Sequence, residues 1–508
     1  MAKKKENSII DSTLQLTIVV LFIKILGLVK KSIIAAVCGV NAETDAFFIA
    51  SEVIIALCTV FFSSISVSFL SMYTQRLRDK GRDSANNLIN AILRIFIPIA
   101  VLILLIFIFC SKDISELLAP SYEGYQLQDL SEYIAIIAVM FVFSCYSLII
   151  NVVLETDKKF LPGKGQAFFQ NIFVIIAAIL FYPQKGIYAL LWAFVIAGFI
   201  QCVQITWNSR KTFKFLLKIS SEKESIKKLL YLAGPLFIGN AIYEINDIVD
   251  KQISSGLGHG GVSILSYGAS INEIVTSLIV TSLSTVLFSH YATWIAEGNI
   301  KRVEVNFKQA LGYLLLIIMP IMVMCFVIGD SIVRILYGRG NFDAQAIVKT
   351  NGVVIGYATG FFFQAARATI VKVYYAFQDT RTPMINGAIS VCVNVMLSIV
   401  LSQYMGALGI ALATSISMLL VTMLLLPGIH KFIPGFSLKS NIGDFTKIVF
   451  ATSIVWITAS VLKNIINLGA YFSFLIIGSY ILFSYVVLIM IFKVTCVKKI
   501  INRFIMKI

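Results

Sequence analysis

Charged residues are scarce in this 508-residue sequence. Asp, Glu, Lys and Arg together make up 13% of it, whereas hydrophobic residues make up 58%. The mean hydropathy of the chain is +0.89. A soluble domain of this size needs a far more charged surface. The composition therefore excludes an ordinary soluble protein and predicts an all-α integral membrane protein that crosses the bilayer many times.

Motifs for catalysis and metal binding are also missing. The eight cysteines show no CxxC spacing and the three histidines lie far apart, so neither a zinc site nor a disulfide framework is expected. GxSxG and HExxH motifs are absent, and Gly163-Lys164-Gly165 lacks the flanking residues of a phosphate loop. No segment between apolar runs exceeds roughly 20 residues, which is too short for a nucleotide-binding domain. We expect no enzyme and no cofactor.

The formal net charge of +16 does not indicate nucleic-acid binding. Lysines and arginines gather in short loops between apolar runs, where they set topology and meet anionic lipid headgroups. Every second loop is basic, as at Lys80, Lys159, Lys214 and Lys439. We therefore expect membrane lipids as partners, no nucleic acid, and both termini on the cytoplasmic side.

Fourteen apolar runs are long enough to cross a bilayer as helices. They cover roughly residues 12–38, 45–74, 87–110, 131–153, 162–182, 186–207, 228–254, 262–290, 305–330, 347–375, 384–402, 406–427, 446–464 and 470–492.

A repeat shows through the middle of the chain. Residues 157–162, DKKFLP, end one span and open the next, and residues 379–383, DTRTP, do the same about 221 residues later. Two further spans then begin alike, at Gly186 and Gly406. The simplest explanation is a duplicated six-span lobe with two spans appended, which is a transporter architecture. The predicted parts are an N-lobe with its linker (1–225), a C-lobe (226–430), and two final spans with a basic cytoplasmic tail (431–508).

Polar side chains recur along single faces of several predicted spans. The first span carries Thr17, Lys24 and Lys31 at intervals of seven, with Lys30 nearby; the second carries Asp45, Glu52, Thr59, Ser66 and Tyr73; the seventh carries Asn240, Glu244, Asp247 and Lys251, with Asp250 beside them; the eighth carries Ser270 and Glu273, and the tenth Arg367. Intervals of three, four and seven place side chains on one helical face. Charges at bilayer depth are costly, so they face a wet cavity or pair with one another. A water-filled central cavity is our interpretation; pairing between helices or snorkelling to the interface is the alternative.

Several segments resemble the lipid II flippase family (MurJ/MviN type) of the MOP exporter superfamily. They are Leu26 to Lys30, Gly39 with Thr44 to Ala50, Gly234-Pro235 with Asn246 to Lys251, Tyr337 to Asp343, Tyr375 to Met384, and Gly409 to Ser415. They occur in the family's order and cover most of the chain up to about residue 430.

The resemblance implies a V-shaped transporter in the bacterial inner membrane. It would flip undecaprenyl-pyrophosphate-linked peptidoglycan precursor to the outer leaflet by alternating access. Spans 1, 2, 7 and 8 line the cavity in that family, and the last two spans form a groove for the lipid tail. The polar seams and the resemblance together give a candidate substrate site. Its residues are Lys24, Lys30, Lys31, Asp45, Glu52, Glu244, Lys251, Ser270, Glu273 and Arg367.

The sequence departs from the family at three positions. The family usually carries arginine where Cys58, Thr59 and Ser270 align, and these cations are expected to grip the pyrophosphate. Another undecaprenyl-linked oligosaccharide, such as a capsule or exopolysaccharide repeat unit, is therefore the alternative substrate. From other classes, a MOP-type small-molecule antiporter and a non-transporting partner of the cell-wall synthesis machinery stay open.

A sodium ion is the one coupling ion for which the sequence suggests ligands. Asp247 and Asp250 on the seventh span could supply oxygens together with Asn394 on the eleventh. Hard cations take carboxylate and amide oxygens. The alternative is that both aspartates pair with Lys251 or cap local backbone.

Overall fold

The computed structural model of the chain describes residues 2–216, 222–277, 282–466, 469–495 and 497. Within these residues every regular element is a helix. Contacts divide the chain into two compact units, Met1–Ser263 and Ile264–Ile508. The predicted basic tail after residue 497 lies outside the described residues.

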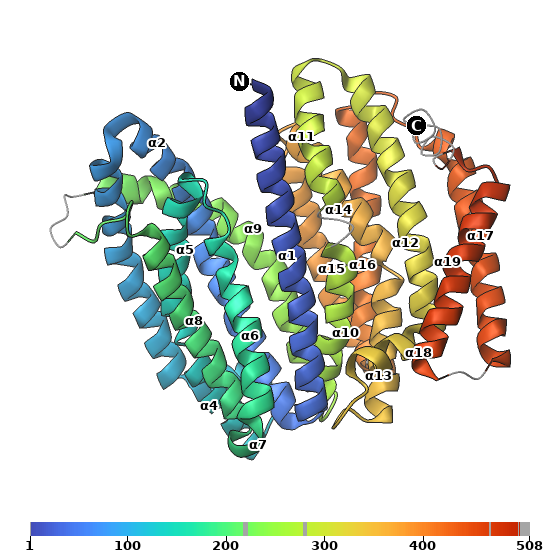
Figure 1. The fold of residues 1–508 in the computed structure, drawn as a ribbon, viewed down its shortest axis with the longest axis horizontal. Helices are drawn as coiled ribbons and strands as arrows, with labels where there is room; N and C mark the ends of the chain where they lie inside the picture. The colour runs from blue at the N-terminus through green and yellow to red at the C-terminus, as the bar shows by residue number, and fades with distance from the viewer. Residues whose placement is uncertain (1, 217–221, 278–281, 467–468, 496, 498–508) are drawn as a thin grey trace. The chain divides into compact units, whose positions relative to one another are not determined.

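The first unit consists of long helices joined by tight turns. Its elements are α1 (Ala2–Cys38), α2 (Ala42–Phe109), α3 (Ser111–Leu118), α4 (Tyr125–Ile137), α5 (Met140–Thr156), a 3-10 turn (Pro162–Lys164), α6 (Gly165–Leu180), α7 (Tyr182–Lys185), α8 (Ile187–Ser209) and α9 (Lys223–Ser255). Figure 1 shows α4 and α5 beside α2, and α6 beside both α1 and α8. Helix α9 also packs along α2. Helix α2 is therefore the element around which this unit is assembled.

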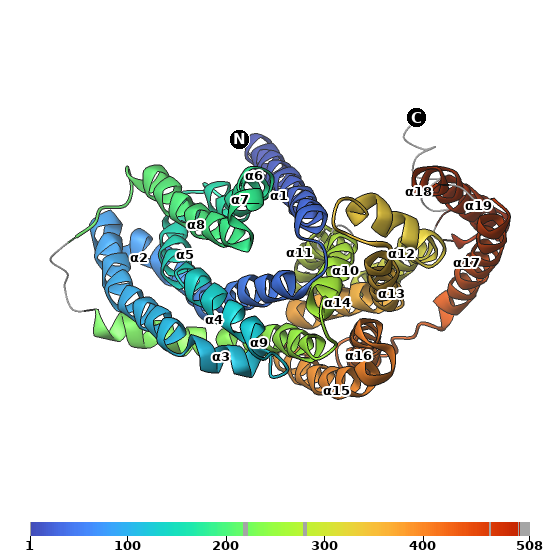
Figure 2. The ribbon, with the colours of Figure 1, turned by 90° about the horizontal axis from the view of Figure 1, so that it is seen from below.

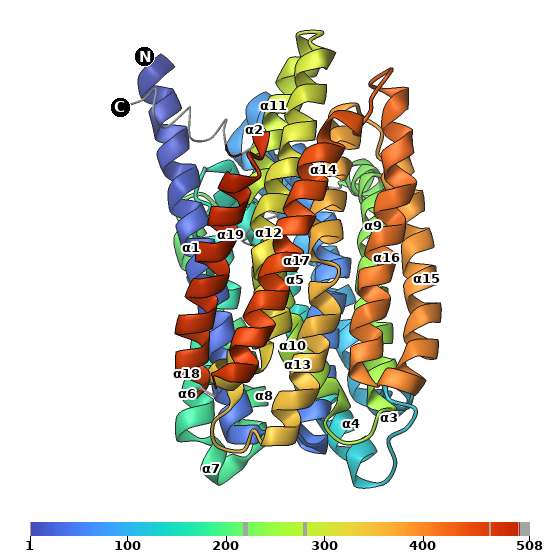
Figure 3. The same ribbon diagram turned by 90° about the vertical axis from the view of Figure 1, so that its right-hand side faces the viewer.

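The second unit also consists of helices packed side by side. Its elements are α10 (Gly261–Thr276), whose first turn still belongs to the first unit, α11 (Ser282–Ala296), α12 (Ile300–Tyr337), α13 (Ala344–Ala358), α14 (Phe361–Ala376), α15 (Arg381–Met405), α16 (Ala407–Gly428), a 3-10 turn (Ile429–Lys431), α17 (Lys439–Ile465), α18 (Ala470–Phe472), a π-helical turn (Ser473–Ile477) and α19 (Gly478–Ile491). Figure 3 shows α15 beside α16 and α17 beside α19. In Figure 2, α17 and α19 stand at one edge of the unit, next to α12.

Two apolar cores hold the second unit together, and α12 contributes to both. One core gathers side chains of α11, α12, α14 and α16 around Phe307 and Tyr374. The other packs α17 and α19 onto α12 around Val327 and Ile481. Helix α12 therefore connects α11, α14 and α16 with α17 and α19.

Each of the fourteen predicted apolar runs is helical over most of its described residues, with short breaks between α4 and α5 and between α13 and α14. By length and composition, nine described helices could cross a membrane, or up to ten if the bent pair α13 and α14 forms one span. Many large apolar side chains, such as Trp192, Phe199 and Phe483, point outward, as expected where lipid is the solvent. The prediction of an all-α, multi-pass membrane fold is confirmed, whereas fourteen spans and their grouping into lobes stay predictions.

Helix α2 contains two of the predicted spans in one 68-residue element. The break between them is Gly81, whose backbone is not helical (φ 77°, ψ 179°). Positive φ strains residues with a Cβ, so glycine is suited to this turn. The polar stretch expected as a loop around Arg76 and Arg82 is therefore mostly helical, because the helices extend beyond their apolar parts.

The internal repeat is visible in the turns. Left-handed backbone conformations recur in pairs roughly 220 residues apart: Gly39 and Gly258, Gly81 and Gly298, Gly124 and Gly340, Lys158 and Gln378, Gly186 and Gly406. Lys158 and Gln378 are not glycines, yet each follows a helix end closed by the same hydrogen bonds. The next residue's N–H reaches five residues back, Lys159 to Leu154 and Asp379 to Tyr374. These matched turns support a duplication of the first six segments.

Candidate substrate-binding site

Three of the predicted site residues form one ionic cluster in the first unit. The Lys31 ammonium of α1 lies 2.9 Å from Oε1 of Glu52 on α2, and the Lys251 ammonium of α9 lies 3.2 Å from Oε2 of the same carboxylate. Only 13–25% of the surface of each of the three side chains is exposed. Charges in this position need partners because water hydrates them poorly. We call these residues the Lys–Glu–Lys cluster; it carries one net positive charge.

The polar faces of α2 and α9 meet along an antiparallel seam. Asn240 of α9 donates a hydrogen bond of 3.0 Å to the Ser64 hydroxyl of α2, and Lys251 meets Glu52 about three turns away. Between these contacts α9 carries Glu244, which is half-buried, and Asp247, which is exposed. The polar stripe predicted on the seventh span therefore lies on α9, where Asn240 and Lys251 contact polar side chains of α2.

Asp45 has a different role from the other predicted residues. Its carboxylate is fully buried and accepts hydrogen bonds from the Gly260 N–H (2.6 Å), the Ser263 N–H (2.7 Å) and the Ser263 hydroxyl (2.6 Å). Free N–H groups at a helix start favour a carboxylate partner. Asp45 therefore caps α10 and joins the α1–α2 turn to the α9–α10 turn; direct contact with a substrate stays a prediction.

The other predicted residues of the first unit surround the cluster on their own helices. Lys24 lies half-buried on α1, two turns before Lys31. The Lys30 ammonium lies 5.4 Å from the centre of the Phe194 ring of α8, so this side chain is directed toward α8. Asp250 is buried and accepts a 3.4 Å hydrogen bond from Asn246 one turn earlier.

Four predicted residues belong to the second unit. Ser270 is buried and donates to the Ser266 carbonyl of its own helix, while Glu273 is exposed. Arg367 is half-buried on α14. Asn394 is buried between α15 and α16, where its amide donates to Thr414 at 3.2 Å. Because Asn394 and the two aspartates lie in different units, the sodium site stays a prediction.

Sequence reasoning missed residues that hold the first helix in place. Buried Asn171 of α6 donates to the Ile23 carbonyl of α1 at 3.1 Å. A Cβ on Gly27 would lie 3.5 Å from the same amide group. This contact fixes α1 at the height of Lys24. The signal was present, since Gly27 shares the helical stripe with Lys24, but Asn171 lies 148 positions from Ile23, the residue to which it donates.

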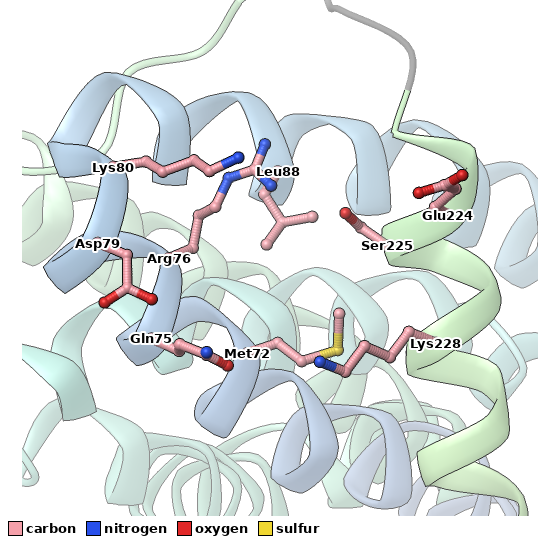
Figure 4. Close-up of a pocket in the computed structure, with 9 residues that line it drawn as sticks. All are labelled: Met72, Gln75, Arg76, Asp79, Lys80, Leu88, Glu224, Ser225 and Lys228. Carbon is pink, nitrogen blue, oxygen red and sulfur yellow. The ribbon is translucent and has the colours of Figure 1, made fainter.

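A second polar pocket lies where α2 approaches the start of α9 (Figure 4). Its volume is about 280 Å³, and α2 contributes Arg76, Asp79 and Lys80 while α9 contributes Glu224 and Lys228. Arg76 is ion-paired with the buried Glu222, which also accepts from Ser225. Both signs of charge line this pocket. We assign it to anchoring α9 on α2, because the Arg76–Glu222 ion pair joins α2 to the start of α9.

The two neighbouring positions where the family usually carries arginine differ in exposure. Cys58 is buried at 4% exposure, whereas Thr59 is exposed on α2. Only Thr59 could therefore present a side chain to a ligand without disturbing the core.

Comparison with solved structures finds proteins of similar fold. The fold is similar to that of the lipid II flippase MurJ in an inward closed conformation (TM-score 0.83, 24% identity, covering 96% of this chain and 100% of that one). It is also similar to a multidrug resistance MATE family transporter of the MOP superfamily in an inward-facing conformation (TM-score 0.70, 13% identity, 80% and 94% covered). The chain therefore shares its fold with these two solved proteins.

Sequence comparison identifies the family to which the chain belongs. The family model described as "Lipid II flippase MurJ" matches residues 34–480. A probable lipid II flippase MurJ of Rhizobium tropici is 23% identical over 406 residues, covering 78% of this chain and 76% of its own length. One of Borreliella burgdorferi is 25% identical over 422 residues, covering 82% of each. The chain belongs to the MurJ family.

Family membership bears on several predictions. It confirms the resemblance found in the sequence, and it agrees with a transporter rather than an enzyme. It favours a lipid II flippase over a small-molecule antiporter, whose solved MATE relatives match with lower identity.

Proposed function

We propose that this chain is a lipid II flippase, which moves the undecaprenyl-pyrophosphate-linked peptidoglycan precursor from the inner to the outer leaflet by alternating access. The observation that carries the proposal is the Lys–Glu–Lys cluster of Lys31, Glu52 and Lys251. Its surplus positive charge lies among apolar helices of a chain in the MurJ family.

The cluster suits a pyrophosphate chemically. Each lysine ammonium is a hydrogen-bond donor, and each lies within ion-pair distance of one Glu52 oxygen. A phosphate oxygen can replace the Glu52 oxygen as the acceptor for either ammonium. Charge-assisted contacts of this kind are stronger than neutral hydrogen bonds. Lys24, on the same helix as Lys31, would add a third cation for the same headgroup.

Glu52 also connects the site to movement. It ties α1, α2 and α9 to one carboxylate. A bound pyrophosphate competes with Glu52 for the two lysines, so occupancy loosens the attachment of α1 and α9 to α2. A ligand shifts a conformational equilibrium only through such differences in affinity between states. This competition would couple headgroup binding to alternating access.

The proposal includes a fourteen-span topology of two six-span lobes in a V shape and two further spans, in the bacterial inner membrane, with both termini cytoplasmic. The apolar helices and the recurring left-handed turns support it. Cysteine labels near Lys80, Lys159, Lys214 and Lys439 should react only from the cytoplasm, and labels near Glu123 and Gly258 only from outside. A single loop on the wrong side would break this topology.

Sodium coupling through Asp247, Asp250 and Asn394 is a further part of the proposal. The buried carboxylate of Asp250 and the buried amide of Asn394 support it, because hard cations bind such oxygens. Transport that is independent of sodium, with normal sensitivity to membrane potential, would rule it out. Contact with the cell-wall synthesis machinery would place the released precursor near the enzymes that use it.

Complementation of a bacterial strain depleted of its own lipid II flippase tests the function. The wild-type chain should restore growth and cell shape, while Lys31→Gln/Lys251→Gln, expressed at the same level, should not. Arg78→Gln is a matched control, since Arg78 is exposed and, among the residues that the structure describes, forms its ion pair with the adjacent Asp79. Failure of the wild-type chain together with transport of another undecaprenyl-linked oligosaccharide would point to the alternative substrate.

A further inference from the structure

An apolar groove crosses the outer face of the first unit. It has a volume of about 650 Å³ and lies between α2, α5 and α8. Its walls include Ile97, Val142, Phe143, Phe199, Val203 and Trp207. A second hollow of about 410 Å³ shares Ile97, Tyr146 and Phe215 with the first. The two hollows therefore lie side by side with these three side chains as their common wall, and we call the pair the groove.

The surface of this groove is apolar and exposed. Phe199, Val203, Trp207 and Phe215 each keep more than half of their surface exposed. The hydroxyls of Tyr146 and Thr206 lie 2.7 Å apart and bond to each other, so they offer little to a polar ligand. Such a surface suits hydrocarbon chains rather than a sugar or peptide.

Two arginines lie at one end of the groove. Asn90 of α2 donates to the Lys214 carbonyl at 2.8 Å and accepts from the Leu216 N–H at 3.1 Å, which holds the segment after α8 against α2. Arg94 follows Asn90 by one turn and lines the smaller hollow. Arg210 ends α8 and lines the larger one, its guanidinium 3.7 Å from the centre of the Trp207 ring.

These arginines leave positive charge at the end of the groove. In the described part of the chain, neither guanidinium has a carboxylate within ion-pair distance. The stacking of Arg210 on Trp207 orients its guanidinium while leaving its donors available. An anionic headgroup complements this end of the groove, and Arg is the side chain best suited to phosphate.

We propose that the groove binds an anionic phospholipid with two acyl chains, such as phosphatidylglycerol. Arg94 and Arg210 hold its phosphate, and each of the two adjacent hollows takes one chain. The presence of two hollows distinguishes this ligand from an undecaprenyl lipid, which has a single chain. The bound lipid fills the space between α2, α5 and α8 and joins them at their lipid-facing side. This inference does not depend on the proposed function.

Native mass spectrometry of the full-length chain tests the site. Dioleoyl-phosphatidylglycerol, dioleoyl-phosphatidylcholine and undecaprenyl phosphate are added separately to the purified protein. An arginine near a phosphate contributes about 1 kcal/mol, or about fivefold in affinity. Arg94→Gln/Arg210→Gln should therefore bind phosphatidylglycerol about 25-fold more weakly and should lose the preference for this anionic lipid over zwitterionic phosphatidylcholine. Val203→Trp, which narrows the groove, should lower phosphatidylglycerol binding with both arginines intact.

The control is Arg78→Gln, an exposed arginine outside the groove. It should bind phosphatidylglycerol like the wild type. Three results would overturn the proposal: unchanged phosphatidylglycerol binding in the double variant, an equal loss in the control, or tighter binding of undecaprenyl phosphate than of phosphatidylglycerol to the wild type.

Discussion

Replacing Glu52 by glutamine should separate the two roles of the Lys–Glu–Lys cluster. The substitution keeps the shape of the side chain but removes the charge that Lys31 and Lys251 share at 2.9 and 3.2 Å. Two ammonium groups then lie near each other without the carboxylate that bridges them. Removing one partner of a buried ion pair costs about 3–5 kcal/mol. Because these side chains keep 13–25% exposure, we expect a loss of about 2–3 kcal/mol in the ligand-free protein.

Binding should change in the opposite direction. The substitution raises the net charge of the cluster by one and removes the competitor for its lysines, so an added pyrophosphate lipid should stabilise Glu52→Gln more than the wild type. Transport should nevertheless fall, since the carboxylate that releases the headgroup is gone. Thermal unfolding of the purified chain, with and without lipid II, measures both effects.

The matched control is Glu43→Gln, which removes an exposed carboxylate from the same helix. A surface change of this kind should shift the free energy of unfolding by less than about 0.5 kcal/mol. Equal stability of Glu52→Gln and wild type, or a smaller lipid-induced stabilisation in the variant, would refute the role given to the cluster.

Three further predictions concern single residues. Lys24→Ala should weaken substrate binding about tenfold or more, since a charge-assisted contact contributes roughly 1.5–3 kcal/mol. Lys24→Arg should bind the substrate with normal affinity. Equal affinity of Lys24→Ala and wild type in a lipid II titration would exclude Lys24 from the site. Asp45→Ala removes the acceptor of three hydrogen bonds and should speed hydrogen exchange at the Gly260 and Ser263 amides; unchanged exchange would contradict the cap. Burial of Asp379 opposes its ionisation, but hydrogen bonds from Thr382 and the charge of Lys431 outweigh it and lower its pKa. The ionised Asp379 therefore stabilises the folded state above its ordinary pKa of about 3.9, and this stabilisation is lost as the pH falls through the lower pKa of the folded state. Asp379→Asn should make the melting temperature depend less on pH in that range. A pH profile identical to that of the wild type would contradict this role of Asp379.

Hydropathy was sufficient to predict the helices, because a bilayer permits few alternatives to apolar helices of about 20 residues. It did not predict where they bend. Helix α13 meets α14 at an angle of 41°, and a Cβ on Gly360 at that break would lie 2.8 Å from the Ser415 Cα. The bend therefore depends on close packing against α16, which hydropathy does not encode.

The substrate site was predictable in part, because the spacing of polar residues shows which face of a helix is polar. Seven-residue spacing placed Lys31 and Glu52 on polar faces, and the structure joins them with Lys251 in one cluster. The capping role of Asp45 was not predictable, since its partners lie more than 200 positions away. Spacing identifies a polar face, but only the tertiary contacts decide whether a carboxylate on it meets a lysine, a helix start or a ligand.

Reconstitution into lipid vesicles tests the central claim most directly. Purified chain and lipid II are incorporated together, and the lipid II that becomes accessible from the opposite leaflet is measured over time with a reagent that cannot cross the membrane. The account predicts exposure that requires the wild-type chain and is lost in Lys31→Gln/Lys251→Gln at equal protein content. Equal exposure with the double variant, or none with the wild-type chain under an imposed membrane potential and sodium gradient, would contradict it.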